Sequence, residues 1–504
     1  MVAAGIHFGN TNSVITIWKD GKVDTVSNET GDRITSTAVA YTGTEKIVGQ
    51  PAKQYMVKNP LSCISNIKSC VGQSFTSEQM QKIKTKCSCH VSNTKNVFSY
   101  QVKVDDNYIK VSPVEAASYI FTKLLEIGEL VGGSELEDVV LTVPHNFSED
   151  QRISLCEAAE NIGCNILRVI SEPAAACLAY GIGQNDPLEH STVLIYRLGG
   201  SSMDACIMEV INGMYHMIHY KSNSDFGSNE FDNVLIKYFT EEFKRIHKED
   251  ISENKRALGK LSAAAEDCKH GLSKLHTIAC AVDSLHDGID FHCQLPRAKF
   301  ESLCSFVFSK CMELVDELLI EASFKVTDID KVILVGGGSR MPRLVQLMKN
   351  KFDSSEILNT IHTEEVLAQG AALQAGLLQG RDDTLNTDVF NLNCVSKNIG
   401  IKLANDDKLC ILLNKNTPVP VKRSANLTVP ASQTTACVYL YECDDATLTG
   451  SLLLAKLVIR DLNSDEAKEL FLNIEFRRNG CLSVILNDRK SNKTESVSIE
   501  MTKI

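Results

Sequence analysis

The sequence predicts a mixed α/β domain followed by an antiparallel β-sandwich, and three observations lead to this fold class. Helical apolar spacing alternates with β-rich runs up to about Gly380. The composition changes at Arg381, after which only strand signals follow. Two segments that lie far apart, residues 5–15 and 195–205, share one strand, small-residue turn, strand rhythm. Such self-similarity is typical of an internal repeat within one fold.

Helices are predicted where apolar residues recur every three or four positions. The predicted segments are 114–131, 230–247, 255–274, 297–322 and 364–379. The second of them follows Gly227, Ser228 and Asn229, which can cap a helix. Their charged faces are expected to be solvated.

The C-terminal part is predicted to consist of strands. Strand-like runs cover 438–441, 452–459 and 470–476, and apolar and polar residues alternate over 497–501. The segment 478–481 contains Asn-Gly, which supplies the positive φ angles of a type I′ hairpin turn. An antiparallel β-sandwich is the simplest arrangement of these strands.

The repeated hairpins predict a site for a polyphosphate. Glycine lets each turn approach a phosphate, and successive backbone N–H groups form an anion-binding concavity. Asn10, Thr11, Ser201 and Ser202 can reinforce such a concavity. Either turn alone is also compatible with an ordinary β-turn, so the prediction depends on the pair.

A third glycine loop supports the nucleotide site. The buried strand predicted over 332–335 runs into Gly336–Pro342, and a helical pattern follows. This layout also occurs as a tight strand-to-helix connection in many α/β folds. The Walker-type phosphate loop is absent from the sequence.

Long collinear stretches resemble the seventy-kilodalton heat-shock chaperones of the DnaK type, from about Ala3 to the C-terminus. The most specific stretches are Leu141–Pro144 with Gln151 and Arg152, Ser171–Gly181, and Phe231–Lys244. The resemblance implies a two-lobed, actin-like ATPase domain over residues 1–380, an interdomain linker over 381–393 and a β-sandwich domain over 394–504. The family's helical lid has no counterpart before Ile504, and Asn391 interrupts the apolar run of the linker.

Carried over position by position, the resemblance implies that Lys68, Glu172 and Asp204 are retained catalytic positions. His270 stands where an arginine usually stacks on the base. The nucleotide-binding positions that the resemblance implies are Gly9, Asn10, Thr11, Gly199, Gly200, Ser201, Ser202, Glu266, Lys269, His270, Ser273, Gly337, Gly338, Ser339, Arg340 and Glu364.

The departures from the family pattern fall on the chemistry. His7 and Arg197 replace hairpin aspartates, Asn10 replaces a catalytic threonine, and Ser201 replaces a glycine. Magnesium prefers oxygen ligands, so its binding is expected to be weakened. Arg197 can neutralise phosphate charge but cannot act as a base. Binding of ATP with weak or lost hydrolysis is the expected outcome.

Structural alternatives exist for both replaced aspartates. His7 can be a core histidine whose ring nitrogens are satisfied at the end of a strand. Arg197 can form an ion pair with Asp204 or Glu172, which would lock the cleft without a nucleotide. The two roles of Arg197 predict that closure of the cleft depends on ATP in one case and not in the other.

Composition restricts the partners and the location. The charge sum is 52 − 63 = −11, which disfavours direct binding to nucleic acid. The sequence contains no run of about 18 apolar residues, and no charged leader precedes the first predicted strand, so we expect a cytosolic protein without a membrane span. The cluster Cys87–His90 lacks a second ligand pair, and no metal-binding residues are assigned.

Among its relatives, the chain is most similar to the atypical lidless heat-shock subunit of ribosome-associated complexes. This resemblance implies stable pairing with a J-domain co-chaperone of the zuotin type, indirect contact with the ribosome and assistance to the folding of nascent polypeptides. Two alternatives remain open: an autonomous, ATP-hydrolysing, peptide-binding chaperone, and a phosphotransferase on the same fold. Magnesium-dependent turnover that J-domain and peptide stimulate would favour the first alternative.

Overall fold

The computed structural model describes most of the chain, in two compact units. The units are Met1–Val143 with Ser154–Gly380, and Pro144–Ile153 with Arg381–Ile504. The described residues are 2–43, 45–94, 97–184, 190–211, 214–379, 395–403, 409–415, 417, 419–431, 433–444, 450–460, 462, 467–477, 480–488 and 493–501. The predicted linker over 381–393 lies outside them and stays a prediction.

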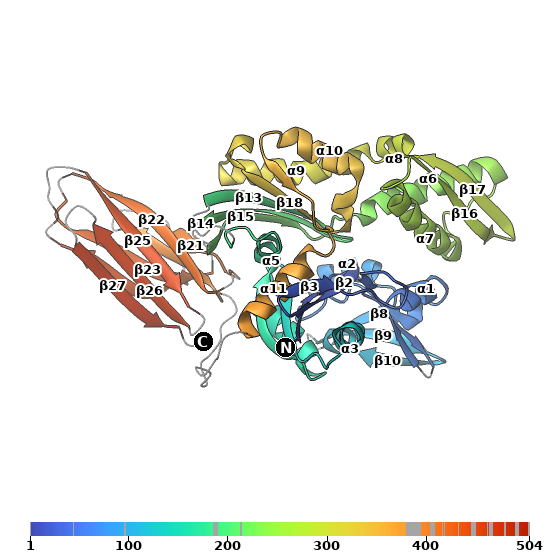
Figure 1. Ribbon diagram of the computed structural model, residues 1–504, viewed down its shortest axis with the longest axis horizontal. Coiled ribbons are helices and arrows are strands. Elements are labelled where there is room, and N and C mark those ends of the chain that lie inside the picture. The colour runs from blue at the N-terminus through green and yellow to red at the C-terminus, as the bar shows by residue number, and fades with distance from the viewer. Residues whose placement is uncertain are drawn as a thin grey trace. The chain divides into compact units, whose positions relative to one another are not determined.

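Two sheets of the first unit repeat one topology (Figure 1). One has the order β12 (Asn165–Ser171), β11 (Asp138–Val143), β1 (Val2–His7), β2 (Asn12–Lys19), β3 (Lys22–Thr25). The other has the order β19 (Glu356–Leu358), β18 (Lys331–Val335), β13 (His190–Leu198), β14 (Met203–Ile211), β15 (Met214–Asn223). In each sheet an antiparallel hairpin pairs on one side with a parallel strand. The predicted internal repeat is therefore confirmed.

Two helices, α5 (Glu172–Ala179) and α11 (Val366–Gln379), lie between these sheets in Figure 1. Their small side chains share one apolar cluster with residues of both sheets, and Ala175 and Ala371 are fully buried in it. Glycine is needed at Gly370, where a Cβ atom would lie 1.9 Å from the carbonyl oxygen of Ala175. The close approach of the two helices joins the two sheets into one unit.

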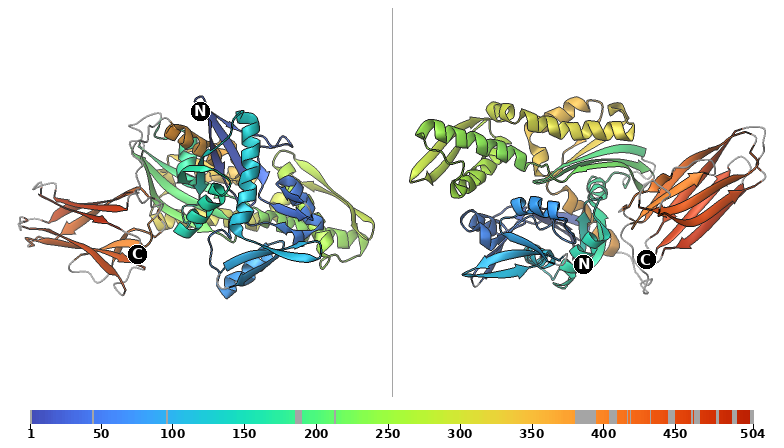
Figure 2. Two further views of the ribbon diagram at one scale, coloured as in Figure 1. Left: turned by 90° about the horizontal axis from the view of Figure 1, so that it is seen from below. Right: turned by 180° about the vertical axis from the view of Figure 1, so that it is seen from behind.

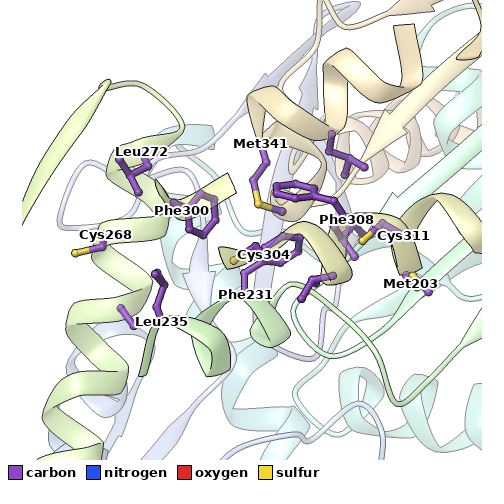
Figure 3. Close-up of a cluster of buried hydrophobic side chains, with 14 of the residues drawn as sticks. Met203, Phe231, Leu235, Cys268, Leu272, Phe300, Cys304, Phe308, Cys311 and Met341 are labelled. Atoms are coloured by element: carbon purple, nitrogen blue, oxygen red, sulfur yellow. The ribbon is translucent and has the colours of Figure 1, made fainter. Parts of the chain in front are cut away.

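The helices on the second sheet enclose a large core, part of which Figure 3 shows. The helices and the hairpin around it are α6 (Asn229–His247), α7 (Lys255–Leu272), β16 (Thr277–His286), β17 (Ile289–Pro296), α8 (Arg297–Leu303), α9 (Ser305–Ala322) and α10 (Pro342–Lys351). The sequence predicted one helix over 297–322, which is wrong at Cys304. This residue leaves the helical conformation with ψ near 11° and is fully buried, so packing divides the segment. The helix predicted over 364–379 begins at Val366.

The remaining elements of the N-terminal part are short strands and four helices. They are β4 (Thr35–Ser36), β5 (Val39–Thr42), β6 (Glu45–Val48), α1 (Gln50–Lys58), β7 (Cys63–Ile64), α2 (Ser77–Lys86), β8 (His90–Thr94), β9 (Val97–Val104), β10 (Asn107–Val111), α3 (Pro113–Gly132) and α4 (Glu149–Glu160). The Ser112 hydroxyl caps α3 by accepting from the Glu115 N–H at 3.0 Å, and Gly133 ends it with a φ of 72°. Of the helices that the structure describes, none is both long and apolar enough to cross a membrane.

The second unit contains two four-stranded antiparallel sheets, visible from two sides in Figure 2. One has the order β21 (Cys410–Leu413), β20 (Asn398–Leu403), β23 (Ala436–Cys443), β24 (Leu452–Ile459). The other has the order β22 (Val421–Val429), β25 (Lys468–Phe476), β26 (Cys481–Asp488), β27 (Lys493–Glu500). Both sheets contribute to one core, which includes Leu440 and Leu472, so the predicted sandwich is confirmed. The described residues after Gln379 form strands and no helix.

Candidate functional site

A pocket of the first unit lies where the two hairpin turns, the glycine loop after β18 and helix α7 meet. It holds about 920 Å³ of empty space, including its opening to solvent. Of the predicted binding residues, all but Ser339 and Arg340 line it. The lining ones are Gly9, Asn10, Thr11, Gly199, Gly200, Ser201, Ser202, Glu266, Lys269, His270, Ser273, Gly337, Gly338 and Glu364.

The two hairpin turns come close together at one wall of the pocket. A Cβ atom at Gly200 would lie 2.1 Å from the hydroxyl oxygen of Thr11, so only glycine fits there. A Cβ atom at Gly9 would lie 1.9 Å from the carbonyl oxygen of Asn12. Glycine therefore permits the close approach of the chain in both turns, at the place where the sequence predicts a phosphate site.

Helix α7 lines the opposite wall with polar residues spaced three or four apart. Lys53 Nζ lies 2.6 Å from Glu266 Oε1. Lys269 Nζ lies 2.5 Å from Asp232 Oδ2. Burial raises the pKa of Asp232 to about 6 although Lys269 opposes the shift. These contacts fix the polar side chains that a nucleoside would meet.

The two predicted binding residues that do not line the pocket, Ser339 and Arg340, lie directly beside it. Ser339 is fully buried, and its hydroxyl donates to the carbonyl oxygen of Val335 at 2.7 Å. Arg340 Nη1 lies 3.4 Å from Glu364 Oε2, and Glu364 does line the pocket. Both residues therefore support the glycine loop. The sequence pattern did not distinguish this supporting role from direct contact with a ligand.

The three predicted catalytic residues are buried and do not line the pocket, but they contact one another through Arg197, which does line it. Lys68 Nζ lies 2.6 Å from Glu172 Oε1, and Arg197 Nε donates to Asp204 Oδ2 at 2.6 Å. Arg197 Nε also lies 3.1 Å from Glu172 Oε2, but that carboxylate oxygen accepts no hydrogen bond from the described residues. Two cations thus face two carboxylates, which is the ion pairing that the sequence left open as an alternative.

The electrostatics of this cluster keep Glu172 ionised. Burial alone would raise the pKa of Glu172, but the positive charges of Lys68 and Arg197 outweigh it and hold the pKa at about 2. Burial would lower the pKa of Arg197, but Asp204 and Glu172 raise it above its ordinary value. The guanidinium therefore stays charged at every pH at which the protein is folded.

His7 ends β1 beside this cluster as a neutral ring. The parallel register places it opposite Thr142 of β11, and His7 Nδ1 shares a hydrogen bond of 2.9 Å with the Thr142 hydroxyl. Burial, together with the positive charges of Lys68 and Arg197, lowers the pKa of His7 to about 3, although Glu172 opposes the shift. One ring nitrogen is therefore satisfied, as the core alternative requires, but His7 also lines the pocket.

The residues present suit a nucleotide better than a magnesium ion. Backbone amides of glycine-rich turns and the hydroxyls of Thr11, Ser201 and Ser202 can bind phosphate oxygens. A magnesium ion needs carboxylate or other oxygen ligands, whereas Glu172 and Asp204 are already paired with cations. Within the described part of the chain, no group of three or more histidine, cysteine, aspartate or glutamate side chains could hold a metal.

Comparison with protein families matches residues 3–504 to the family described as Hsp70 protein. The chain belongs to the Hsp70 family. Members of this family are ATP-binding chaperones, and the mixed α/β part and the C-terminal sheets are those of the Hsp70 fold.

Curated relatives cover the chain from end to end. It is 38% identical to heat shock 70 kDa protein 14 of Rattus norvegicus and of Homo sapiens, in each case over 99% of this chain and 100% of the relative. It is 37% identical to heat shock 70 kDa protein 14-B of Xenopus laevis, over 100% of both chains.

Some residues of the Hsp70 pocket and its surroundings escaped the sequence analysis. Ser228 and Asn229 line the pocket, where they had been considered only as a helix cap. Ser228 makes no side-chain capping bond, so that expectation is wrong for its hydroxyl. Thr142 shares a hydrogen bond with His7, and Asn66 accepts one from Asn10. The motif Leu141–Pro144 contained Thr142, but only the register of β1 and β11 shows its partner.

Substituting His7 should change how the stability of this Hsp70 domain depends on pH. The folded-state pKa of about 3 lies below the ordinary value of 6.5, so the unfolded chain takes up a proton first as the pH falls. The stability that this group contributes is complete above pH 6.5 and is lost towards pH 3. Between about pH 7.5 and about pH 5.5, wild type should lose about 1.4 kcal/mol more than His7→Gln.

Urea unfolding of both proteins at the two pH values measures this difference. Glutamine can keep a hydrogen bond to Thr142, and the other histidines titrate alike in both proteins, so the comparison isolates His7. Equal pH dependence of the two proteins would mean that folding leaves the pKa of His7 unchanged.

Proposed function

We propose that this Hsp70-family protein binds ATP with little or no hydrolysis and acts as a chaperone subunit beside a J-domain co-chaperone. The observation that carries the proposal is the chemistry beside the phosphate hairpins. His7 and Arg197 stand where the family resemblance implies carboxylates, and Arg197 pairs with Asp204 and lies close to Glu172.

Neither Glu172 nor His7 is a useful general base at neutral pH. A base works best when its pKa lies near the operating pH, and such a base contributes about 10²–10⁴-fold to a rate. The pKa of Glu172 is about 2 and that of His7 is about 3. Both groups are therefore unprotonated but too weakly basic to take a proton from water efficiently.

Binding does not need these groups to react. The hydroxyls of the turns and the polar residues of α7 line the pocket and can contact a nucleotide. A ligand that binds only the folded state stabilises it by mass action. ATP would thus act as a structural ligand of the first unit.

The partner assignment rests on the family resemblance together with the match along the whole length of heat shock 70 kDa protein 14. We propose a J-domain partner of the zuotin type, indirect contact with the ribosome, nascent polypeptides as the eventual clients, and a cytosolic location. In this role the protein contributes a nucleotide-stabilised conformation to its partner, which stimulates a separate, hydrolysing Hsp70.

ATP binding and single-turnover hydrolysis, measured on one preparation, test the proposal. Wild type should bind ATP and hydrolyse it at least about tenfold more slowly than the double variant His7→Asp with Arg197→Asp. The assay contains excess magnesium chloride, because the restored carboxylates would act by binding a magnesium ion. Turnover by wild type as fast as by the variant would refute the loss of hydrolysis.

Two further measurements keep the test decisive. If the double variant fails to bind ATP, the single-turnover rate of wild type is measured with and without a J-domain and a client peptide. That rate then decides whether hydrolysis is weak. Strong stimulation would favour the alternative of an autonomous, hydrolysing chaperone. Sedimentation with ribosomes that depends on the J-domain partner would support the assigned complex, and sedimentation without it would contradict indirect contact.

A further inference from the structure

Asn10 makes more contacts than a turn residue needs. Its Nδ2 donates to Asn66 Oδ1 at 2.9 Å and to Ser201 Oγ at 2.7 Å. Its Oδ1 accepts from the backbone N–H of Ser69 at 3.3 Å. A side-chain amide has two donor hydrogens, and both are used here. One side chain therefore ties together three segments that are distant in sequence.

The bond to Ser201 crosses between the two hairpins. Asn10 lies in the turn between β1 and β2, whereas Ser201 lies in the turn between β13 and β14. The turns are in tight contact here, since a Cβ atom at Gly200 would overlap Thr11. The bond thus directly connects the two sheets, at the wall of the pocket where phosphates are expected.

The bond to Asn66 extends the connection to the segment of the catalytic lysine. Asn66 has a left-handed φ of 56° and donates from Nδ2 to the carbonyl oxygen of Lys86, the last residue of α2. Lys68 follows two residues later and pairs with Glu172. Asn10 is therefore the junction between both hairpins and the Lys68 segment.

We propose that Asn10 and Ser201 form a latch that holds the two hairpins together over a bound nucleoside di- or triphosphate. The inference rests on the proposed nucleotide site and adds two positioning residues to it. Both residues depart from the threonine and glycine that the family resemblance implies at these positions, and each departure supplies one partner of the bond. Closure of the pocket then depends partly on the protein's own hydrogen bond.

The latch also orients a donor for the phosphate. Ser201 Oγ accepts from Asn10, so its own hydrogen is left to be donated. Among the residues that the structure describes, the hydroxyl of Ser201 has a hydrogen bond with Asn10 alone, and Ser201 lines the pocket. A phosphate oxygen is the acceptor that fits this position. Asn10 itself has no donor hydrogen left for the phosphate.

Release of fluorescent MANT-ADP and MANT-ATP from the full-length protein tests the latch. Ser201→Ala and Asn10→Ala should each speed the release of both nucleotides, about two- to tenfold for the loss of one partly buried hydrogen bond. In the double variant the two effects should be less than additive, because both substitutions remove the same bond and only the phosphate donor of Ser201 is lost in addition.

Ser202→Ala is the matched control. Ser202 is the neighbouring serine of the same turn, but its hydroxyl accepts from Arg197 Nη2 at 3.1 Å within its own sheet. The effect of Ser202→Ala on release should therefore add to that of Asn10→Ala. Additive effects of Ser201→Ala and Asn10→Ala, or unchanged release, would overturn the latch.

A measurement without nucleotide separates this inference from the proposed function. Hydrogen exchange of the turn amides over 9–12 and 199–202 should be faster in nucleotide-free Ser201→Ala than in wild type. If wild type binds neither nucleotide, the proposed function fails, and the exchange result alone decides on the latch. If Ser201→Ala does not fold, Ser201→Cys, with its weakly accepting sulfur, takes its place in both measurements.

Discussion

Replacing Arg197 with methionine should destabilise the first unit by about 3–5 kcal/mol. The substitution leaves the carboxylates of Asp204 and Glu172 buried with only Lys68 to compensate them. Removing one partner of a buried ion pair is costly because the remaining charge is neither solvated nor paired. Asp204 should be affected most, since Glu172 keeps its contact with Lys68.

The loss should shrink as the pH falls. Burial and Glu172 already raise the pKa of Asp204, and the removal of Arg197 takes away the charge that opposes them. A carboxyl group with a raised folded-state pKa destabilises the fold above that pKa and no longer does so once it is protonated. Combining Arg197→Met with Asp204→Asn should likewise recover part of the stability at neutral pH.

Urea unfolding followed by circular dichroism measures these changes. Arg245→Met is the matched control, because Arg245 also pairs with a glutamate, Glu242 at 2.7 Å, but its side chain is 68% exposed. An exposed pair contributes at most about 1 kcal/mol. If Arg197→Met cost no more than Arg245→Met, the ion pairs of Arg197 would contribute little to the fold.

Gly370→Ala should destabilise the first unit by about 3 kcal/mol, the upper end of the usual range for overpacking. The added Cβ atom would lie 1.9 Å from the carbonyl oxygen and 3.0 Å from the Cα atom of Ala175. These are backbone atoms of α5, so no side chain can rotate away. The helices α11 and α5 would have to separate.

Separation of these helices should also weaken ATP binding, because α5 begins at Glu172 and α11 packs between the two sheets. Gly259→Ala in α7 is the matched control, since its nearest contact would be an ordinary 3.7 Å to the carbonyl oxygen of Val57. In a helix that substitution should stabilise by about 0.5–1 kcal/mol. Thermal unfolding and ATP titration of both variants check the difference, and similar behaviour would show that α11 can shift without cost.

Local chemistry made much of the fold predictable. Apolar period and turn residues located the helices predicted over 230–247 and 255–274 and four of the strands of the sandwich, because both signals depend only on neighbours in the chain. The break at Cys304 was missed because its cause is burial against α6 and other distant elements, which the apolar spacing cannot report.

The sequence by itself determined the repeated hairpins, their glycines and the replacement of carboxylates by His7 and Arg197, since residue identity and short-range pattern are enough for these. Only the tertiary structure decided what the replaced residues contact. His7 meets Thr142 across 135 positions and Asn10 meets Ser201 across 191. The pKa values and the pairing of charges depend on burial and on such distant neighbours, so packing alone makes His7 a neutral residue at the wall of the pocket and Arg197 the partner of buried carboxylates.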